Sequence, residues 1–203
     1  HNMDAAVYGA RACCIGGAVG TATVLAGKMF DIPISGTMAH SWVMFYNDEF
    51  EAFKKYAENY PDGTVLLVDT YDVLESGIPN AIRVAKEVLE PMGKRLLGIR
   101  LDSGDLAYLS KKARKMLDDA GLTDCKIVVS NSLDEFTINS LLEQGACIDS
   151  FGVGERMITS KSEPVFGAVY KMAAVEENGK FVPRIKVSEN IEKITNPGLK
   201  KVL

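Results

Sequence analysis

Residues 96–105 read LLGIRLDSGD, a short apolar run that passes directly into arginine, aspartate, serine and glycine. Four other apolar runs also end in polar or glycine-rich residues, and they are centred near Ile34, Leu66, Val128 and Ser150. The runs are spaced about 30 residues apart, and nearer 20 for the last, which is the period of a βα unit. Because the runs are continuously apolar, as strands buried on both faces are, the sequence predicts an α/β fold with a parallel sheet.

Helical patterns fill the gaps between these runs. Apolar residues recur at helical spacing in four segments, which are residues 48–60, 79–89, 103–120 and 133–144. We expect Asp102 or Ser103 to cap the third helix and Ser132 to precede the fourth. An N-terminal stretch rich in alanine and glycine, residues 5–25, predicts helices that pack closely against a neighbour.

The C-terminal part has a different pattern. Two strand-like runs, residues 168–175 and 181–187, flank an Asn-Gly pair at 178–179, which predicts a β-hairpin. We therefore place a boundary after residue 167. Residues 1–167 are the expected α/β barrel core segment, and residues 168–203 are a hairpin and tail that belong to a second domain of a longer protein.

Composition excludes several classes of protein. The chain has 203 residues, is 47% hydrophobic and 25% charged, and carries a net charge of −4, so it does not resemble a general nucleic-acid or membrane-surface binder. The longest uncharged stretch, residues 12–27, is short for a membrane span and is interrupted by glycine and threonine. We see no signal peptide, and the absent initiator methionine suggests a piece of a longer protein.

Four cysteines are present, and none of them forms a CxxC pair. With one internal histidine, the chain lacks the usual ligands of a zinc site. We expect reduced thiols in a cytosolic protein, at Cys13, Cys14, Cys125 and Cys147.

His40 is the internal histidine, and it lies just past the run centred near Ile34. Asp69 and Asp72 follow the next run. A carboxylate can fix one ring nitrogen of a histidine and leave the other nucleophilic, so His40 is a candidate catalytic residue. The alternative is a structural or surface histidine.

Two further groups of residues follow the later runs. An arginine at a strand end, here Arg100, typically holds an anion, and Asp102 and Asp105 beside it suit ribose hydroxyls or a magnesium-bound polyphosphate. The amides of Gly152 and Gly154 can cradle a phosphate. The alternatives are a helix cap and a plain turn. If the strands are parallel, all these ends meet at one face, where α/β barrels keep their chemistry.

Taken in order, these strings resemble a known family. GTMAHS at 36–41, VDTYD at 68–72, RLDSGD at 100–105 and DSFGVG at 149–154, with glycine-rich residues 16–27, resemble the nicotinate phosphoribosyltransferase family. Its members are considerably longer, so the chain is similar to their central barrel segment. The resemblance implies an incomplete TIM-like parallel α/β barrel of the type II phosphoribosyltransferases, followed by a C-terminal β-hairpin.

The resemblance also implies an activity. The family joins nicotinate to phosphoribosyl pyrophosphate in NAD salvage, giving nicotinate mononucleotide and pyrophosphate, and it couples this transfer to ATP hydrolysis through a phosphohistidine. Mg²⁺ accompanies ATP and phosphoribosyl pyrophosphate, with no dedicated protein metal site expected. The implied parent protein is a cytoplasmic homodimer with shared active sites. Because the family also uses residues upstream of this segment, we expect the isolated segment to be inactive.

Matching positions give each residue an implied role. His40 corresponds to the phosphorylated histidine, and Asp69 corresponds to the carboxylate that orients it. Arg100 and Asp102 match residues that hold the nicotinate and ribose region. Asn131 lies at the strand end that contacts the ribose phosphate, and Gly152 and Gly154 match the phosphate-binding loop.

Substrate alternatives remain open. Relatives that use nicotinamide carry an aspartate within a Gly-Thr-x-Thr stretch, whereas residues 20–23 place Ala22 there, which favours the acid. Quinolinate enzymes do not use a phosphohistidine, so His40 speaks against them. A different class of function, a catalytically silent phosphate-binding domain, is the other alternative.

Overall fold

The computed structural model describes residues 3–164, 172–184, 198 and 200–201. The chain divides into two units, residues 1–164 and residues 165–203. The boundary expected after residue 167 falls within 165–171, outside the described residues. The predicted strand segments 168–171 and 185–187 also lie outside them.

The first unit contains a four-stranded parallel sheet. Its strands are β1 (Val65–Leu67), β2 (Gly98–Leu101), β3 (Lys126–Val129) and β4 (Ser150–Phe151), and they lie in the order β1-β2-β3-β4. Strands that are consecutive in the chain are therefore neighbours in the sheet, as in an α/β barrel. The predicted parallel α/β fold is confirmed, as an incomplete TIM-like barrel.

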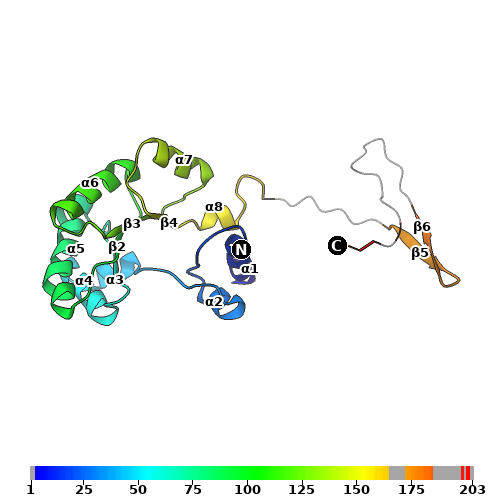
Figure 1. Ribbon diagram of the computed structural model, residues 1–203, viewed down its shortest axis with the longest axis horizontal. Helices are drawn as coiled ribbons and strands as arrows, with labels where there is room; N and C mark the ends of the chain where they lie inside the picture. The colour runs from blue at the N-terminus through cyan, green and yellow to red at the C-terminus, as the bar shows by residue number, and fades with distance from the viewer. Residues whose placement is uncertain (1–2, 165–171, 185–197, 199, 202–203) are drawn as a thin grey trace. The chain divides into compact units, whose positions relative to one another are not determined.

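Helices connect the strands and lie outside them (Figure 1). A helix precedes β1, and one helical segment follows each of the first three strands. The helix before β1 is α4 (Glu49–Asn59). The segment between β1 and β2 consists of π turn η1 (Val73–Gly77), α5 (Ile78–Val84), π turn η2 (Ala85–Leu89) and 3-10 turn η3 (Glu90–Met92). Helix α6 (Leu106–Asp119) follows β2, and helix α7 (Glu135–Glu143) follows β3. All four predicted helical segments are confirmed.

The predicted cap of the third helix is wrong by a few residues. Asp105 caps α6 by accepting the backbone N–H of Tyr108, and Asp134 caps α7 through the N–H of Thr137. The expected cap residues of α6, Asp102 and Ser103, instead donate hydrogen bonds to the carboxylate of Asp69. Because these contacts hold Asp102 and Ser103 at the strand ends, α6 begins at Leu106 and not at residue 103.

The predicted strand near Ile34 is also wrong. Ile34 forms an isolated parallel bridge with Thr21, and the backbone of Thr21 hydrogen-bonds to Pro33 and Ser35. This run therefore pairs with the chain upstream of it, and it lies outside the named strands of the sheet. It leads into α3 (His40–Phe45), the helix that begins at the candidate histidine.

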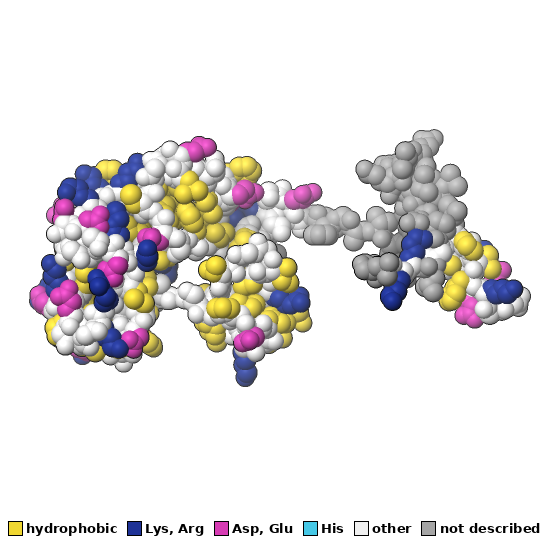
Figure 2. Space-filling model, in the orientation of Figure 1, with side chains coloured by type: hydrophobic (Ala, Val, Ile, Leu, Met, Phe, Trp, Pro, Cys, Tyr) yellow, Lys and Arg dark blue, Asp and Glu magenta, His cyan; other side chains and the backbone are white. Residues whose placement is uncertain are grey.

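Helices at the N-terminus confirm the close packing expected there. They are α1 (Met3–Ile15) and α2 (Val24–Phe30), and α1 also contacts the short helix α8 (Glu155–Ile158). A Cβ built on Gly9 of α1 would lie 2.5 Å from Cγ1 of Ile158, so glycine permits this approach. Several apolar side chains on α1 and α2 are exposed on this part of the surface (Figure 2).

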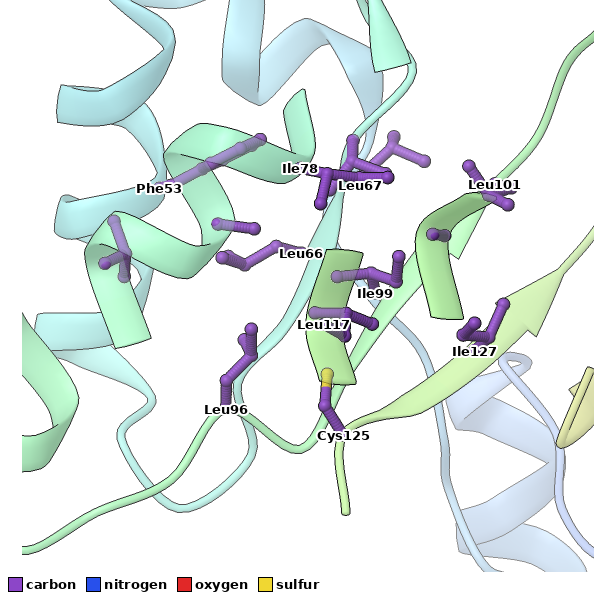
Figure 3. Packing of buried hydrophobic residues seen from close by; sticks show 14 of the residues in the cluster. Phe53, Leu66, Leu67, Ile78, Leu96, Ile99, Leu101, Leu117, Cys125 and Ile127 are labelled. Atoms are coloured by element: carbon purple, nitrogen blue, oxygen red, sulfur yellow. The ribbon is translucent and has the colours of Figure 1, made fainter. Parts of the chain in front are cut away.

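The core of the sheet follows the strand register. Leu66, Ile99 and Ile127 are aligned on neighbouring strands and fully buried, and they pack near Leu117 of α6 (Figure 3). Arg100 is the next residue along β2 after Ile99, so it projects from the opposite face. The alternation of the strand therefore places an arginine on the face away from α6.

The second unit contains a two-stranded antiparallel hairpin. Its strands are β5 (Ala174–Glu177) and β6 (Lys180–Pro183). Asn178 and Gly179 between them have φ angles of 52° and 77°, as a type I′ turn requires at both positions. The hairpin predicted from the Asn-Gly pair is confirmed. Within the described part of the chain, no helix is both long and apolar enough to cross a membrane.

Gly77, the last residue of η1, packs directly onto the end of β1. A Cβ at this position would lie 1.8 Å from the carbonyl oxygen of Val68, which is backbone and adjoins Asp69. We expect Gly77→Ala to lower the free energy of unfolding by at least about 1–3 kcal/mol, the usual cost of overpacking. Urea titration measures this loss, and Gly63→Ala is the control because nothing lies within 4 Å of its Cβ. Equal stability of the two variants would contradict the prediction.

Candidate functional site

His40 is the first residue of α3, and its ring faces the ends of β1 and β2. Its Nδ1 lies 3.0 Å from Oγ1 of Thr70, within hydrogen-bonding distance. Its Nε2 lies 3.6 Å from Oδ2 of Asp102 and 4.0 Å from Oδ1 of Asp69. The His40 side chain is 38% exposed, so a ligand can reach the ring.

Asp69 is buried and joins the ends of β1 and β2. Its Oδ2 accepts the backbone N–H of Asp102 at 2.9 Å and the hydroxyl of Ser103 at 2.6 Å. Its Oδ1 is buried, has no hydrogen-bond partner among the described residues, and is the Asp69 oxygen that faces His40. A separation of 4.0 Å is too long for a hydrogen bond, so Asp69 faces the ring while Thr70 contacts it directly.

Arg100 projects from β2 into a set of acceptors from three segments. Its Nη1 donates to Oγ1 of Thr37 at 2.6 Å and its Nε donates to Oγ of Ser130 at 3.1 Å. Its Nη2 pairs with Oδ2 of Asp102 at 3.2 Å. These contacts fix the orientation of the planar guanidinium. The Arg100 side chain is 23% exposed, so its positive charge remains accessible.

Asp102 connects this arginine to the next strand. Its Oδ1 accepts the hydroxyl of Ser130 at 2.5 Å, and its Oδ2 lies between Arg100 and His40. A positive guanidinium, two carboxylates and an imidazole therefore share one polar network at the carboxyl ends of β1, β2 and β3. The structure brings His40, Asp69, Arg100 and Asp102 together as the sequence predicted.

The loops after β3 and β4 border the same network. The amide of Gly152 donates to the carbonyl of Val129 at 2.7 Å, and a Cβ on Gly152 would lie 3.3 Å from Cβ of Ser130. Asn131 follows Ser130 with a φ of 97°, in the left-handed region, and its side chain is exposed. Gly154 lies directly before α8. Roles of these three residues toward phosphate stay predictions.

An ion pair links these two loops. Arg156 of α8 contacts the carboxylate of Asp134, which also accepts the amide and hydroxyl of Thr137 at 2.8 and 2.7 Å. The hydrogen bonds from Thr137, together with Arg156, lower the pKa of Asp134 to about 2. The carboxylate is thus ionised at neutral pH and holds both the start of α7 and the segment after Gly154.

Stability should depend on the charge of Asp134. Because its pKa in the folded protein is below the ordinary value of 3.8, the ionised group stabilises the fold above that value and loses this contribution as the pH falls toward 2. An asparagine still caps the helix but carries no charge. We expect Asp134→Asn to be less stable at neutral pH, with a difference that shrinks below pH 4. Urea midpoints measured from pH 7 to pH 3 check this, and a constant difference would contradict it.

The cysteine thiols are free. Burial raises the pKa of Cys125 to about 12, and it also raises the pKa of Cys13. Since the thiolate is the reactive form, Cys125 stays an unreactive thiol at neutral pH.

Three site residues were missed in the sequence. Thr70, Thr37 and Ser130 provide the hydroxyls that contact His40 and Arg100. The signal was present, because Thr70 and Ser130 directly follow strand-like runs and Thr37 lies within the GTMAHS string. Hydroxyl side chains carry no charge and occur widely at strand ends, so the sequence pattern distinguishes them less clearly than the carboxylates beside them.

Comparison with known proteins agrees with this geometry. A model of the "Nicotinate phosphoribosyltransferase (NAPRTase) family" matches residues 15–196. The chain belongs to this family. The nicotinate phosphoribosyltransferase of Bacillus subtilis is 61% identical over the whole chain, and that of Dictyostelium discoideum is 40% identical over 97% of it.

Two solved structures share the fold. Human nicotinic acid phosphoribosyltransferase aligns with a TM-score of 0.66 and 28% identity over 73% of this chain and 39% of its own. A nicotinate-nucleotide pyrophosphorylase from Pyrococcus furiosus aligns with a TM-score of 0.65 and 30% identity over 79% of this chain and 40% of its own. The chain spans about two fifths of the length of its relatives, 41% for Bacillus subtilis and 40% for Dictyostelium discoideum.

Proposed function

We propose that these residues form the core of a nicotinate phosphoribosyltransferase, acting within a longer polypeptide. The enzyme joins nicotinate to phosphoribosyl pyrophosphate and yields nicotinate mononucleotide and pyrophosphate. The observation that carries this proposal is the network in which His40, Asp102 and Arg100 meet at the strand ends. It combines a nucleophilic imidazole with an accessible guanidinium in a chain of this family.

Each charged group suits one part of the reaction. Arg100 offers a fixed positive charge to the carboxylate of nicotinate, since charge-assisted pairs orient planar anions well. Transfer of the ribosyl group develops positive charge on the sugar, as in glycoside cleavage, and the carboxylate of Asp102 stabilises such charge. The exposed loops at Asn131, Gly152 and Gly154 are proposed to bind phosphate through their backbone amides.

His40 is proposed to couple the reaction to ATP. Its ring accepts the γ-phosphoryl group and passes it to water, and the energy released drives the transfer. The buried carboxylate of Asp69 faces the ring and favours a positively charged imidazole after it is phosphorylated. Thr70 contacts the other ring nitrogen.

The remaining partners follow from the polyphosphate chemistry. We propose that Mg²⁺ arrives bound to ATP and to phosphoribosyl pyrophosphate, as hydrated Mg²⁺ commonly does. Asp102 is 26% exposed, and each carboxylate oxygen has two acceptor directions, so it can receive a hydrogen bond from a magnesium-bound water. A cytoplasmic homodimer is the proposed form of the complete protein.

An assay of the full-length protein tests this function. Purified protein is incubated with nicotinate, phosphoribosyl pyrophosphate, ATP and Mg²⁺, and mononucleotide and pyrophosphate are measured. We expect turnover that ATP stimulates, and no turnover by the isolated chain of 203 residues. Binding of ribose 5-phosphate without turnover by the full-length protein would instead indicate a silent phosphate-binding domain.

Ala22 should contribute to the choice of the acid. It follows Thr21, whose backbone pairs with the segment that leads to Thr37 and so to Arg100. Without an acceptor at position 22 the NH2 of nicotinamide stays unpaired, at a cost of about 1–3 kcal/mol. We expect the full-length protein to prefer nicotinate by at least about tenfold in kcat/KM.

Adding a carboxylate at position 22 should reduce this preference. Ala22→Asp supplies an acceptor for the amide and repels the acid, so kcat/KM for both substrates is measured in each protein. Val19→Asp adds the same charge three residues away, at a side chain that is 93% exposed, and serves as the control. A stronger preference for the acid in Ala22→Asp would show that position 22 does not select between the acid and the amide.

A further inference from the structure

The His40 ring is contacted on its two nitrogens by groups of different character. Nδ1 meets the hydroxyl of Thr70 at 3.0 Å, whereas Nε2 faces the carboxylates of Asp102 at 3.6 Å and Asp69 at 4.0 Å. The other charged group nearby is Arg100, which pairs with Oδ2 of Asp102 at 3.2 Å.

These surroundings distinguish the two tautomers of the neutral ring. An ionised carboxylate can only accept hydrogen bonds, so Asp102 and Asp69 favour the tautomer with its proton on Nε2. Nδ1 then carries the lone pair, and the Thr70 hydroxyl is the donor in their hydrogen bond.

We infer that Thr70 is a positioning residue whose hydroxyl, by donating to Nδ1, holds His40 in the Nε2–H tautomer and in one ring orientation. The ring makes this one hydrogen bond among the described residues, because both carboxylates lie beyond hydrogen-bonding distance. The effect of Thr70 on catalysis rests on the proposed function, whereas its effect on the tautomer and orientation of the His40 ring does not.

The backbone around Thr70 is fixed on both sides. The preceding residue, Asp69, accepts hydrogen bonds from Asp102 and Ser103 at the end of β2. Two residues later, Asp72 accepts the amides of Leu74 and Glu75 at 2.9 and 2.7 Å and so caps η1. Since threonine is also branched at Cβ and restricted in χ1, its hydroxyl has little freedom to leave the ring.

Loss of the hydroxyl should free the ring. In Thr70→Val the shape is kept, but Nδ1 loses its donor and the imidazole can rotate about χ2 and exchange tautomers. The attacking lone pair is on Nδ1, and the Thr70 O–H proton rotates away from it when the phosphoryl group arrives, so the ring is already oriented for the reaction. In Thr70→Val the ring samples several orientations and reacts more slowly, because each productive encounter then requires an ordering step. Thr70→Ser keeps the donor and should behave close to the natural protein.

Nitrogen-15 NMR of the full-length protein, labelled at histidine, tests the inference directly. A His40→Gln variant identifies the signals of His40. At alkaline pH, where imidazole is neutral, we expect well-separated Nδ1 and Nε2 shifts for His40, with the proton on Nε2. In Thr70→Val these shifts should move toward each other, while Thr70→Ser and the exposed control Thr123→Val retain them.

An assay of phosphoenzyme in the full-length protein provides the second readout. With labelled ATP, we expect the rate of phosphoenzyme formation to fall about three- to tenfold in Thr70→Val, the effect of one neutral hydrogen bond. Thr70→Ser should restore the rate. A loss caused by misfolding would also lower the urea midpoint of Thr70→Val, whereas a loss of positioning alone would leave that midpoint close to the natural value.

The outcomes separate the two proposals. Unchanged His40 shifts in Thr70→Val overturn the positioning role, and so does a proton found on Nδ1 in the natural chain. If Thr70→Val does not fold, the same comparison between Thr70→Ser and Thr70→Ala decides. If the shifts change as expected and the natural full-length protein forms no phosphoenzyme, Thr70 still positions His40 and the proposed coupling to ATP is wrong.

Discussion

Replacing His40 with alanine in the full-length protein should abolish the phosphoenzyme and the stimulation by ATP. In the proposed function the imidazole is the nucleophile that accepts the phosphoryl group, and alanine offers no atom to replace it. We expect phosphoenzyme formation from labelled ATP to fall more than about a hundredfold, since removal of a nucleophile removes its whole covalent step. Some transfer without ATP should survive, because Arg100 and Asp102 contact each other and Ser130 independently of His40.

A matched control isolates the ring from the helix that carries it. Ser41 is the next residue of α3 and is exposed, so Ser41→Ala should retain both the phosphoenzyme and the stimulation by ATP. A His40→Ala protein that still forms an acid-labile phosphoenzyme would show that another residue is the acceptor.

Much of the fold could be predicted because its determinants are local. Buried parallel strands require continuously apolar runs, and Leu66, Ile99 and Ile127 lie in such runs at a regular spacing. The Asn178–Gly179 turn was predictable for a similar reason, since its backbone conformation favours those residue types. The run at Ile34 was not, because whether an apolar segment joins a sheet depends on which partner it meets. Here Thr21 pairs with it.

The candidate site was predictable to the level of the strand ends. Carboxyl ends of parallel strands meet at one edge, so Asp69, Arg100 and Asp102 had to be neighbours once the strands were assigned. Their partners could not be predicted in the same way. Asp69 binds the backbone of Asp102, and Thr70 is the residue that hydrogen-bonds to His40. This choice depends on a difference of about 1 Å between the distances from the ring to Thr70 and to Asp69, which only the packed structure sets.

Arg100 is the residue on which binding of nicotinate should depend most. Replacing it with glutamine removes the charge that we propose faces nicotinate and leaves Asp102 without its cation. A charge-assisted hydrogen bond typically contributes about 1.5–3 kcal/mol, so kcat/KM for nicotinate should fall about ten- to a hundredfold or more. The value for nicotinamide should fall less, because the amide carries no charge.

The geometry of the guanidinium adds a second expectation. Arg100→Lys keeps the charge but cannot reach Thr37, Ser130 and Asp102 together, since an ammonium lacks the planar fork. It should therefore recover part of the activity of Arg100→Gln and fall short of arginine. The control is Arg95→Gln, because Arg95 is exposed and pairs with Asp124 on the surface. Steady-state kinetics with both substrates measure these effects, and an Arg100→Gln protein that loses activity equally toward acid and amide would show that Arg100 holds the fold of the site and not the carboxylate of nicotinate.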